Sequence, residues 1–209
     1  MKTILVANRK GGCGKTMTAI TIAAALAQTG GRTAIADADP QKSALRWLKM
    51  RPVTVPAIVG VDWTKSGKVG DVPKHLDWLV IDAPGAIREG RAEALIAEAK
   101  AVISPVLPSF FDEDSTRRFL GDIEDIKRVR KGKVGIHMIA NRVRPNQKST
   151  ARLKSFFDEI GQVPLAWISE RTAYADLAED GLAVFDKPLS SNRAMRNQWA
   201  PVVDAITAH

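Results

Sequence analysis

A glycine-rich run between a strand-like and a helix-like segment constrains the fold of this chain more than any other feature. Residues 10–16 read Lys-Gly-Gly-Cys-Gly-Lys-Thr, after the apolar run 3–7 and before the alanine-rich run 17–27. Glycines let backbone N–H groups turn toward an anion, and the N-terminus of a helix adds partial positive charge. This strand–loop–helix order predicts a phosphate-binding loop within an α/β fold.

The predicted loop contains two lysines. Lys15 is placed to reach the β- and γ-phosphates of a nucleotide, and the hydroxyl of Thr16 is placed to bind Mg²⁺. The regular Gly-x-x-x-x-Gly-Lys-Thr spacing would need glycine at position 9, where the chain has Arg9. Lys10 instead opens a Lys-Gly-Gly-x-Gly-Lys-Thr variant. The alternative for Lys10 is a solvated surface charge on a loop.

Apolar strand-like runs alternate with helical periodicity along the chain. The expected strands are 3–7, 32–36, 78–82, 101–107, 134–140 and 163–168. The expected helices are 17–27, 42–50, a segment from Gly85 to about 100, a long amphipathic helix with Phe119, Leu120, Ile123, Ile126 and Val129, a helix with Leu153, Phe156, Phe157 and Ile160, and a C-terminal helix. Residues 52–75 are expected to be irregular, with one short strand. This order predicts an α/β fold, a mostly parallel twisted sheet with helices on both faces.

Length and composition limit the class of protein. The 209 residues suggest one domain, 1–209, with 45% hydrophobic and 26% charged residues. A single cysteine, Cys13, excludes a disulfide framework and a cysteine-ligated zinc site, and fits a reducing cytoplasm. We see neither a signal peptide nor an apolar stretch of the ~20 residues that span a bilayer. The net charge of +8 and pI near 9.8 favour a polyanionic partner, and the predicted partner is nucleic acid.

Three aspartates lie where predicted strands end, the edge at which open α/β sheets bind ligands. Asp82 ends the run 78–82. A buried bare carboxylate is costly, whereas Mg²⁺ compensates its charge, so Asp82 is predicted to hold Mg²⁺ directly or through water. Asp37 and Asp39 lie two residues apart, and Pro40 is placed to open the next helix. Asp82 and Asp39 each have an alternative role as a helix N-cap.

The loop at 10–16 and the run Asp37-Ala-Asp-Pro-Gln41 resemble the ParA/MinD family of dimeric ATPases with a deviant Walker A motif. Pro105-Val-Leu-Pro108 and Ile168-Ser-Glu-Arg171 echo further segments of that family. The likeness is strongest to the small ParA-type partition and cargo-positioning ATPases, and it weakens in 52–76. It implies a P-loop NTPase fold and the cofactors ATP and Mg²⁺.

The resemblance also implies roles for individual residues. Lys10 would cross a dimer interface to the partner's ATP, and Asp39 would orient the attacking water. Asp37 would lie near the Mg²⁺ shell formed with Thr16 and Asp82. The implied catalytic set is Lys10, Lys15 and Asp39, and the implied nucleotide-binding set is Lys10, Gly11, Gly12, Cys13, Gly14, Lys15, Thr16, Met17 and Asn141, with Asn141 recognising adenine. Met17 departs from the family pattern, which has a second threonine that contacts the α-phosphate.

Basic residues gather in the C-terminal half of the chain, beginning with the run 127–133. That run has an alternative explanation, because Asp112–Asp114 begin its helix and basic residues at the end complement the macrodipole. By resemblance, Arg171 and Arg193 match positions that contact DNA phosphates, and Arg196 would share a helix face with Arg193. No sequence-reading module is recognisable, so binding is expected to be non-specific and dependent on salt.

The resemblance implies an ATP-dependent dimerising switch that binds DNA and positions a cargo, with hydrolysis stimulated by a ParB-like or other adaptor protein. Such a protein would be cytoplasmic and nucleoid-associated. A MinD-like membrane anchor is one alternative, but the C-terminal stripe Met195, Trp199, Val202, Val203 and Ile206 is better explained by core packing, since Asp204 lies opposite and Pro201 interrupts the helix. An amide-forming ligase of related fold is another alternative, although the length leaves little room for a glutaminase region.

Overall fold

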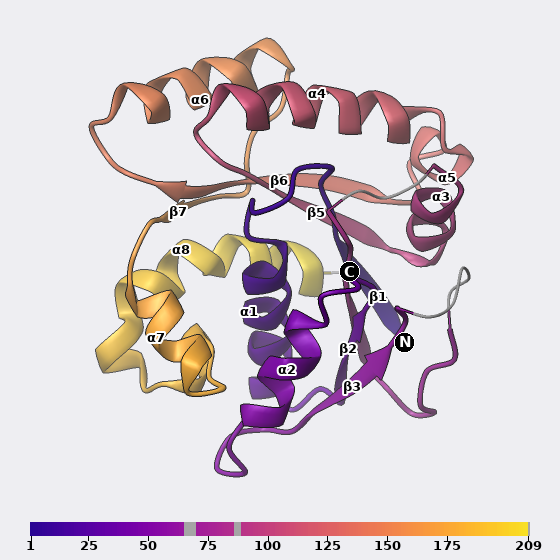
Figure 1. Cartoon of the computed structure of the whole chain (residues 1–209), viewed down its shortest axis with the longest axis vertical. Helices are drawn as coiled ribbons and strands as arrows, with labels where there is room; N and C mark the ends of the chain where they lie inside the picture. Colours follow the sequence, from indigo (N-terminus) through magenta and orange to yellow (C-terminus); the bar gives the residue numbers. More distant parts are fainter. Residues whose placement is uncertain (65–69, 86–88, 209) are drawn as a thin grey trace.

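The structure is a computed structural model that describes residues 1–64, 70–85 and 89–208. Its centre is a seven-stranded, wholly parallel sheet in the order β3-β2-β4-β1-β5-β6-β7 (Figure 1). The strands are β1 (Lys2–Val6), β2 (Thr33–Asp37), β3 (Ile58–Asp62), β4 (Trp78–Asp82), β5 (Ala101–Val106), β6 (Gly135–Val143) and β7 (Ala166–Ser169). The predicted α/β fold is confirmed, including one short strand within 52–75.

Helices cover both faces of the sheet (Figure 1). One face carries α1 (Lys15–Gln28), α2 (Ser43–Met50), α7 (Ala173–Glu179), the 3₁₀ turn η1 (Val184–Asp186) and α8 (Leu189–Thr207). The other carries α3 (Glu89–Glu98), α4 (Phe110–Glu124), α5 (Lys127–Arg130) and α6 (Lys148–Glu159). Strands buried on both faces explain the continuous apolar runs: Ile4 packs into the core beneath α1, and Leu5 packs into the opposite one.

The carboxyl edge of the sheet brings the predicted acidic residues together. Asp82 is the last residue of β4 and pairs in register with Val6 of β1 and with Asp37 of β2. The loop that follows β1 therefore lies beside both carboxylates. This edge is where the sequence places the candidate site.

Three predicted elements differ from the structure. The long amphipathic helix is broken at Ile126, whose extended backbone separates α4 from α5 while Ile126 and Val129 stay packed against the core. Strand β6 runs to Val143, with an irregularity in its pairing with β7 between Ala140 and Val143, so Asn141 lies within the strand rather than after it. Strand β7 begins at Ala166, because Val163 is 88% exposed and Pro164 cannot donate to the sheet.

The C-terminal helix packs as predicted. Met195, Trp199, Val202 and Ile206 are buried in the core, and Val203 is half-buried. Pro201, however, does not interrupt α8: it is exposed within the helix, and the irregular backbone is instead at Asn192. Within the ranges that the structure describes, no helix is both long enough and apolar enough to cross a bilayer.

Candidate nucleotide-binding site

The loop of residues 7–14 joins β1 to α1 at the carboxyl edge of the sheet (Figure 1). Gly12 (φ +79°) and Gly14 (φ +95°) have left-handed backbones, which glycine adopts at little steric cost. A Cβ atom on Gly14 would lie 2.3 Å from Nδ2 of Asn141, whereas one on Gly11 or Gly12 would meet no described atom within 4 Å. The middle of the loop is therefore open to a ligand, while its end is packed against β6.

Asn8 anchors the start of the loop. Its Nδ2 lies 3.2 Å from Oγ of Ser104, 3.0 Å from the carbonyl oxygen of Pro105 and 3.1 Å from Oγ1 of Thr116, and its Oδ1 accepts a bond from the backbone N–H of Lys10 at 3.1 Å. These contacts tie the loop to β5 and α4. Asn8 is absent from the predicted site, although a buried polar residue between an apolar strand and a glycine-rich loop is a usable signal.

Lys15, the first residue of α1, is buried inside the loop. Its Nζ donates to the carbonyl oxygen of Lys10 at 2.7 Å and lies 3.9 Å from Sγ of Cys13. The anionic oxygens of a phosphate are stronger acceptors than a carbonyl, so a nucleotide can take over this ammonium group. Burial raises the pKa of the Cys13 thiol, so Cys13 packs the loop as a neutral side chain.

Thr16 and Asp82 meet at the edge of the sheet, with Thr16 Oγ1 donating to Asp82 Oδ2 at 2.7 Å. The other carboxylate oxygen of Asp82 is buried and has no hydrogen-bond partner among the described residues. Burial raises the pKa of Asp82 to about 7. A hydroxyl beside an uncompensated carboxylate oxygen is a donor set that fits Mg²⁺, which prefers oxygen ligands.

These two residues are too few to hold a metal by themselves. In the described part of the chain, no group of three or more His, Cys, Asp or Glu residues is arranged to bind a metal ion. Mg²⁺ usually reaches such sites with water and substrate phosphates completing its shell. The site thus fits Mg²⁺ brought with a nucleotide.

Asp37 is fully buried and organises the turn between β2 and α2. Its Oδ1 accepts a bond from the backbone N–H of Asp39, and its Oδ2 accepts one from that of Leu45, both at 3.1 Å. Burial raises the pKa of this carboxyl group, which these bonds oppose. Asp39, half-buried at the edge, accepts from the N–H of Gln41 at 2.9 Å.

The helix N-cap alternatives for the aspartates are wrong. Helix α2 begins at Ser43, with Lys42 at its N-cap, so Asp39 does not cap it and Pro40 does not open it. Asp82 is the last residue of a strand, seven positions before α3 begins. Both acids are therefore held at the sheet edge rather than on a helix end.

A cleft of about 530 Å³ continues from the phosphate loop toward β7 and α7. Its lining includes Gly14, Met17, Asn141, Tyr174 and Trp199. Asn141 Nδ2 donates to the carbonyl oxygen of Cys13 at 2.8 Å, and its Oδ1 accepts from the N–H of Arg142 at 3.0 Å. The volume of the cleft is typical of small-molecule sites. Asn141 lies between the phosphate loop and this cleft, which has room for the base of a nucleotide.

The mouth of this cleft is charged. Glu170 accepts bonds from Arg142 and Arg144, which lower the pKa of its carboxyl group. The next residue, Arg171, is exposed and also lines the cleft. The arginine predicted to contact DNA thus lies at the rim of the nucleotide cleft.

The other two predicted DNA contacts lie on α8 and differ in accessibility. Arg193 is exposed. Arg196 is half-buried: its guanidinium donates to the carbonyl oxygens of Phe185 at 2.7 Å and Lys187 at 2.5 Å, and it stacks over the Phe185 ring. The structure therefore holds Arg196 against its own chain.

Lys10 differs from Lys15 in its surroundings. Its side chain is half-exposed and forms no ion pair with the residues that the structure describes. Asp112 lies at the start of α4, and its pKa is raised by burial and lowered in part by the charges of Lys10 and Lys15. Asp112 was not predicted from the sequence.

The parallel sheet, the loop at the N-terminus of α1 and the Thr16–Asp82 pair define a P-loop nucleotide-binding protein. Residues 4–184 match the family model described as the CobQ/CobB/MinD/ParA nucleotide binding domain. The chain belongs to this family, which confirms the resemblance seen in the sequence.

Relatives of known function lie among partition and positioning proteins. The chain is 30% identical over 191 residues to maintenance of carboxysome distribution protein A of Halothiobacillus neapolitanus, covering 88% of this chain and 86% of that protein. It is 28% identical over 195 residues to the chromosome-partitioning ATPase Soj of Thermus thermophilus, covering 76% and 78%. The solved ATP complex of a Cyanothece McdA variant has the same fold, with a TM-score of 0.75 at 19% identity over 100% of this chain and 96% of that one.

Proposed function

We propose that this chain is an ATP-dependent switch whose two copies pair face to face when Mg²⁺ and ATP are bound. The pair binds DNA without sequence preference and positions an intracellular cargo. The observation that carries this proposal is the unequal placement of two lysines in one loop. Lys15 is buried where its own nucleotide would bind, whereas Lys10 is half-exposed without an ion-pair partner in the described chain. Lys10 is therefore left for a second anion, the nucleotide of the other copy.

Hydrolysis of ATP follows from positioning rather than from strong acid–base chemistry. The loop N–H groups and Lys15 would hold the phosphates, and Asp39 would orient the attacking water. Thr16 and Asp82 would hold Mg²⁺, which when bound neutralises charge on the β- and γ-phosphate oxygens. Asp37 keeps the β2–α2 turn in shape through its bonds to the N–H groups of Asp39 and Leu45.

DNA binding is supported by the net charge of +8 and by exposed arginines at 171 and 193. These side chains would contact phosphates, so affinity should fall steeply as salt rises. Arg196 would contribute only after leaving the carbonyl oxygens of Phe185 and Lys187.

A ParB-like or other adaptor protein would link the pair to its cargo and stimulate hydrolysis. The similarity to relatives named for carboxysome distribution and for chromosome partitioning supports a role in positioning a cargo. We place the protein in the cytoplasm, on the nucleoid. Membrane anchoring by α8 is disfavoured, since its apolar stripe is occupied in the core.

The test is retention of the purified chain on non-specific DNA with ATP, with ADP and without nucleotide, each repeated at rising salt. Retention specific to ATP and lost with salt is expected, together with a doubled mass in ATP. Equal retention in all three nucleotide states would contradict the switch, and no retention in any state would contradict DNA binding.

A further inference from the structure

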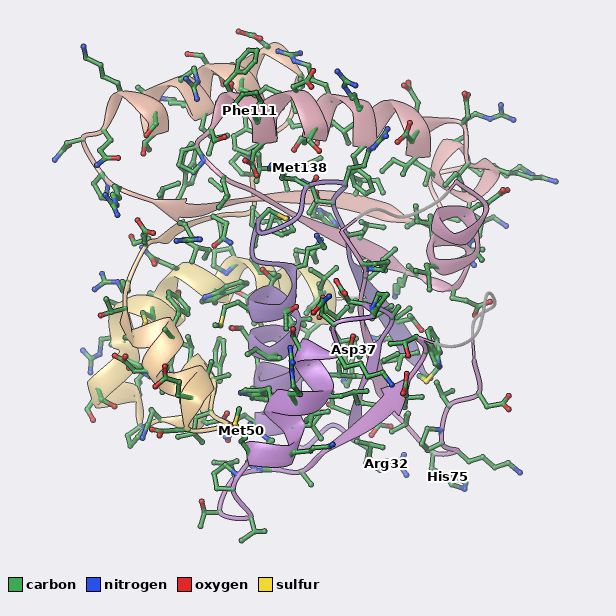
Figure 2. All side chains as sticks on the ribbon, viewed as in Figure 1. Arg32, Asp37, Met50, His75, Phe111 and Met138 are labelled. Carbon is green, nitrogen blue, oxygen red and sulfur yellow. The ribbon has the colours of Figure 1, made fainter. Side chains whose placement is uncertain are left out.

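Two adjacent phenylalanines are exposed on the first turn of α4. Phe110 is 64% exposed and Phe111 is 71% exposed, and their rings form an edge-to-face pair with centroids 5.7 Å apart (Figure 2 labels Phe111). Every other phenylalanine of the described chain is at least half-buried. Large apolar side chains that gather on a surface mark interaction sites more often than single exposed ones do.

These rings lie at the nucleotide edge of the sheet. Helix α4 follows β5, so its first turn stands at the same carboxyl edge as the phosphate loop. Thr116, on the next turn, contacts Asn8, which also accepts a bond from the N–H of Lys10. Burial raises the pKa of Asp112, the residue directly after the two rings, and the charges of Lys10 and Lys15 lower it in part. The rings and Lys10 are thus on one edge of the molecule.

The rings of Phe110 and Phe111 do not pack into the hydrophobic core of the described chain. The inner side of α4 is formed by Asp112, Glu113, Thr116, Phe119 and Ile123, all of which are buried. The outer side begins with Phe110 and Phe111 and continues with Asp114 and Arg118, which form an exposed ion pair at 3.1 Å. The patch formed by these four residues therefore contains an apolar centre with an acid and a base beside it.

We propose that Phe110 and Phe111 form the apolar centre of the contact between two copies of this chain in the ATP-bound pair. This inference rests on the proposed function, because ATP brings the two nucleotide edges together. A twofold contact must be complementary to itself, and a patch that contains both Asp114 and Arg118 meets that condition: each acid can face the other copy's base. Aromatic residues, phenylalanine included, are enriched at interfaces, and a few well-packed residues near the centre carry most of the affinity.

The test compares the chain carrying Phe110→Ser and Phe111→Ser with a matched control, Val163→Ser. Val163 is 88% exposed and precedes β7, so it lies at the opposite edge of the sheet. Because all three residues are exposed, neither variant removes core packing, and thermal unfolding checks this. Analytical ultracentrifugation with Mg²⁺ and ATP gives the dimer dissociation constant, and a fluorescent ATP analogue gives nucleotide affinity in dilute monomer.

We expect the double variant to dimerise at least tenfold more weakly than the parent, with nucleotide affinity unchanged and with Val163→Ser like the parent. Equal dimerisation of parent and double variant would overturn the inference while leaving the proposed switch intact. If the two phenylalanines instead bind an adaptor protein, the double variant would dimerise like the parent but its ATP hydrolysis would no longer be stimulated by the adaptor. That result would also overturn the inference. A parent that stays monomeric in ATP would refute the proposed pairing and this contact together.

Discussion

The hydroxyl of Thr16 and the carboxylate of Asp82 are joined by a 2.7 Å hydrogen bond, although 66 positions separate the two residues. Parallel pairing of β1 with β4 brings Asp82 level with the end of β1, and the phosphate loop returns Thr16 to the same edge. One carboxylate oxygen remains buried without a hydrogen-bond partner in the described structure. Thr16 and Asp82 thus offer oxygen ligands to a cation. Without the cation, the buried oxygen of Asp82 that lacks a hydrogen-bond partner lowers the stability of the protein.

This loss of stability gives a prediction for pH. The folded-state pKa of Asp82 is raised to about 7, so the folded protein holds a proton that the unfolded chain releases near pH 4. Folding stability should therefore fall as pH rises from about 4 to about 7, by roughly 2–4 kcal/mol from this group. Urea unfolding of metal-free parent and Asp82→Asn should show a flatter pH profile in the variant. Identical pH profiles of stability for the parent and Asp82→Asn would contradict a raised pKa of Asp82 in the folded protein.

Lys15→Ala should abolish nucleotide binding. The ammonium group is buried in the loop, 2.7 Å from the carbonyl oxygen of Lys10, where the phosphates would lie. Losing a buried charge-assisted contact to phosphate removes far more nucleotide affinity than losing an exposed ion pair does. Binding of a fluorescent ATP analogue, with Lys49→Ala as an exposed-lysine control, measures this. If Lys15→Ala bound ATP with the affinity of the parent, the assignment of this loop as the nucleotide-binding site would be wrong.

Asp39→Ala should trap the ATP-bound pair. Asp39 is not the cap of α2, and its loss removes only the bond to the N–H of Gln41 from the described structure. The variant should therefore fold, bind ATP and hydrolyse it at least tenfold more slowly than the parent. Phosphate release measures the rate, and sedimentation in ATP measures pairing. Hydrolysis at the parental rate would remove Asp39 from the catalytic set.

The sequence predicted those parts of the site that depend on local order along one strand and the loop after it. Strand ends placed Asp37 and Asp82 at one edge, and the glycines placed Lys15. Asp112 could not be found in this way, because the loop lysines that act on it lie about a hundred residues away along the chain. The position of Asn8 directly after β1 is a local signal, but its partners Ser104 and Thr116 are equally distant in sequence. The break at Ile126 was missed for a similar reason: helical periodicity continues through Val129 although the backbone turns.

Arg193→Glu should weaken retention on DNA while leaving ATP-dependent pairing intact. Arg193 is exposed, so reversing its charge replaces phosphate attraction with repulsion without disturbing the core. Losing one phosphate contact should also lower the slope of log affinity against log salt by about 1. Retention across a salt series, with Lys49→Glu as a control of equal charge change, measures both. Retention equal to that control would reject this surface.

Asp186→Ala should destabilise the fold more than any exposed charge deletion. Asp186 accepts two bonds from the guanidinium of Arg51, at 2.7 and 2.8 Å, and both side chains are buried. It also accepts from the N–H of Ala183, so η1 is joined to the end of α2. Removing one partner leaves a buried charge unpaired, which costs about 3–5 kcal/mol.

The matched control is Asp122→Ala, which deletes the acid of the exposed Arg9–Asp122 pair. Exposed pairs contribute about 0–1 kcal/mol, so the midpoint of urea unfolding should hardly move in the control and should fall clearly in Asp186→Ala. Because Arg51 stacks on Trp47, the tryptophan fluorescence of the folded variant should change as well. Equal unfolding midpoints for the two variants would show that the buried pair does not hold η1 to α2.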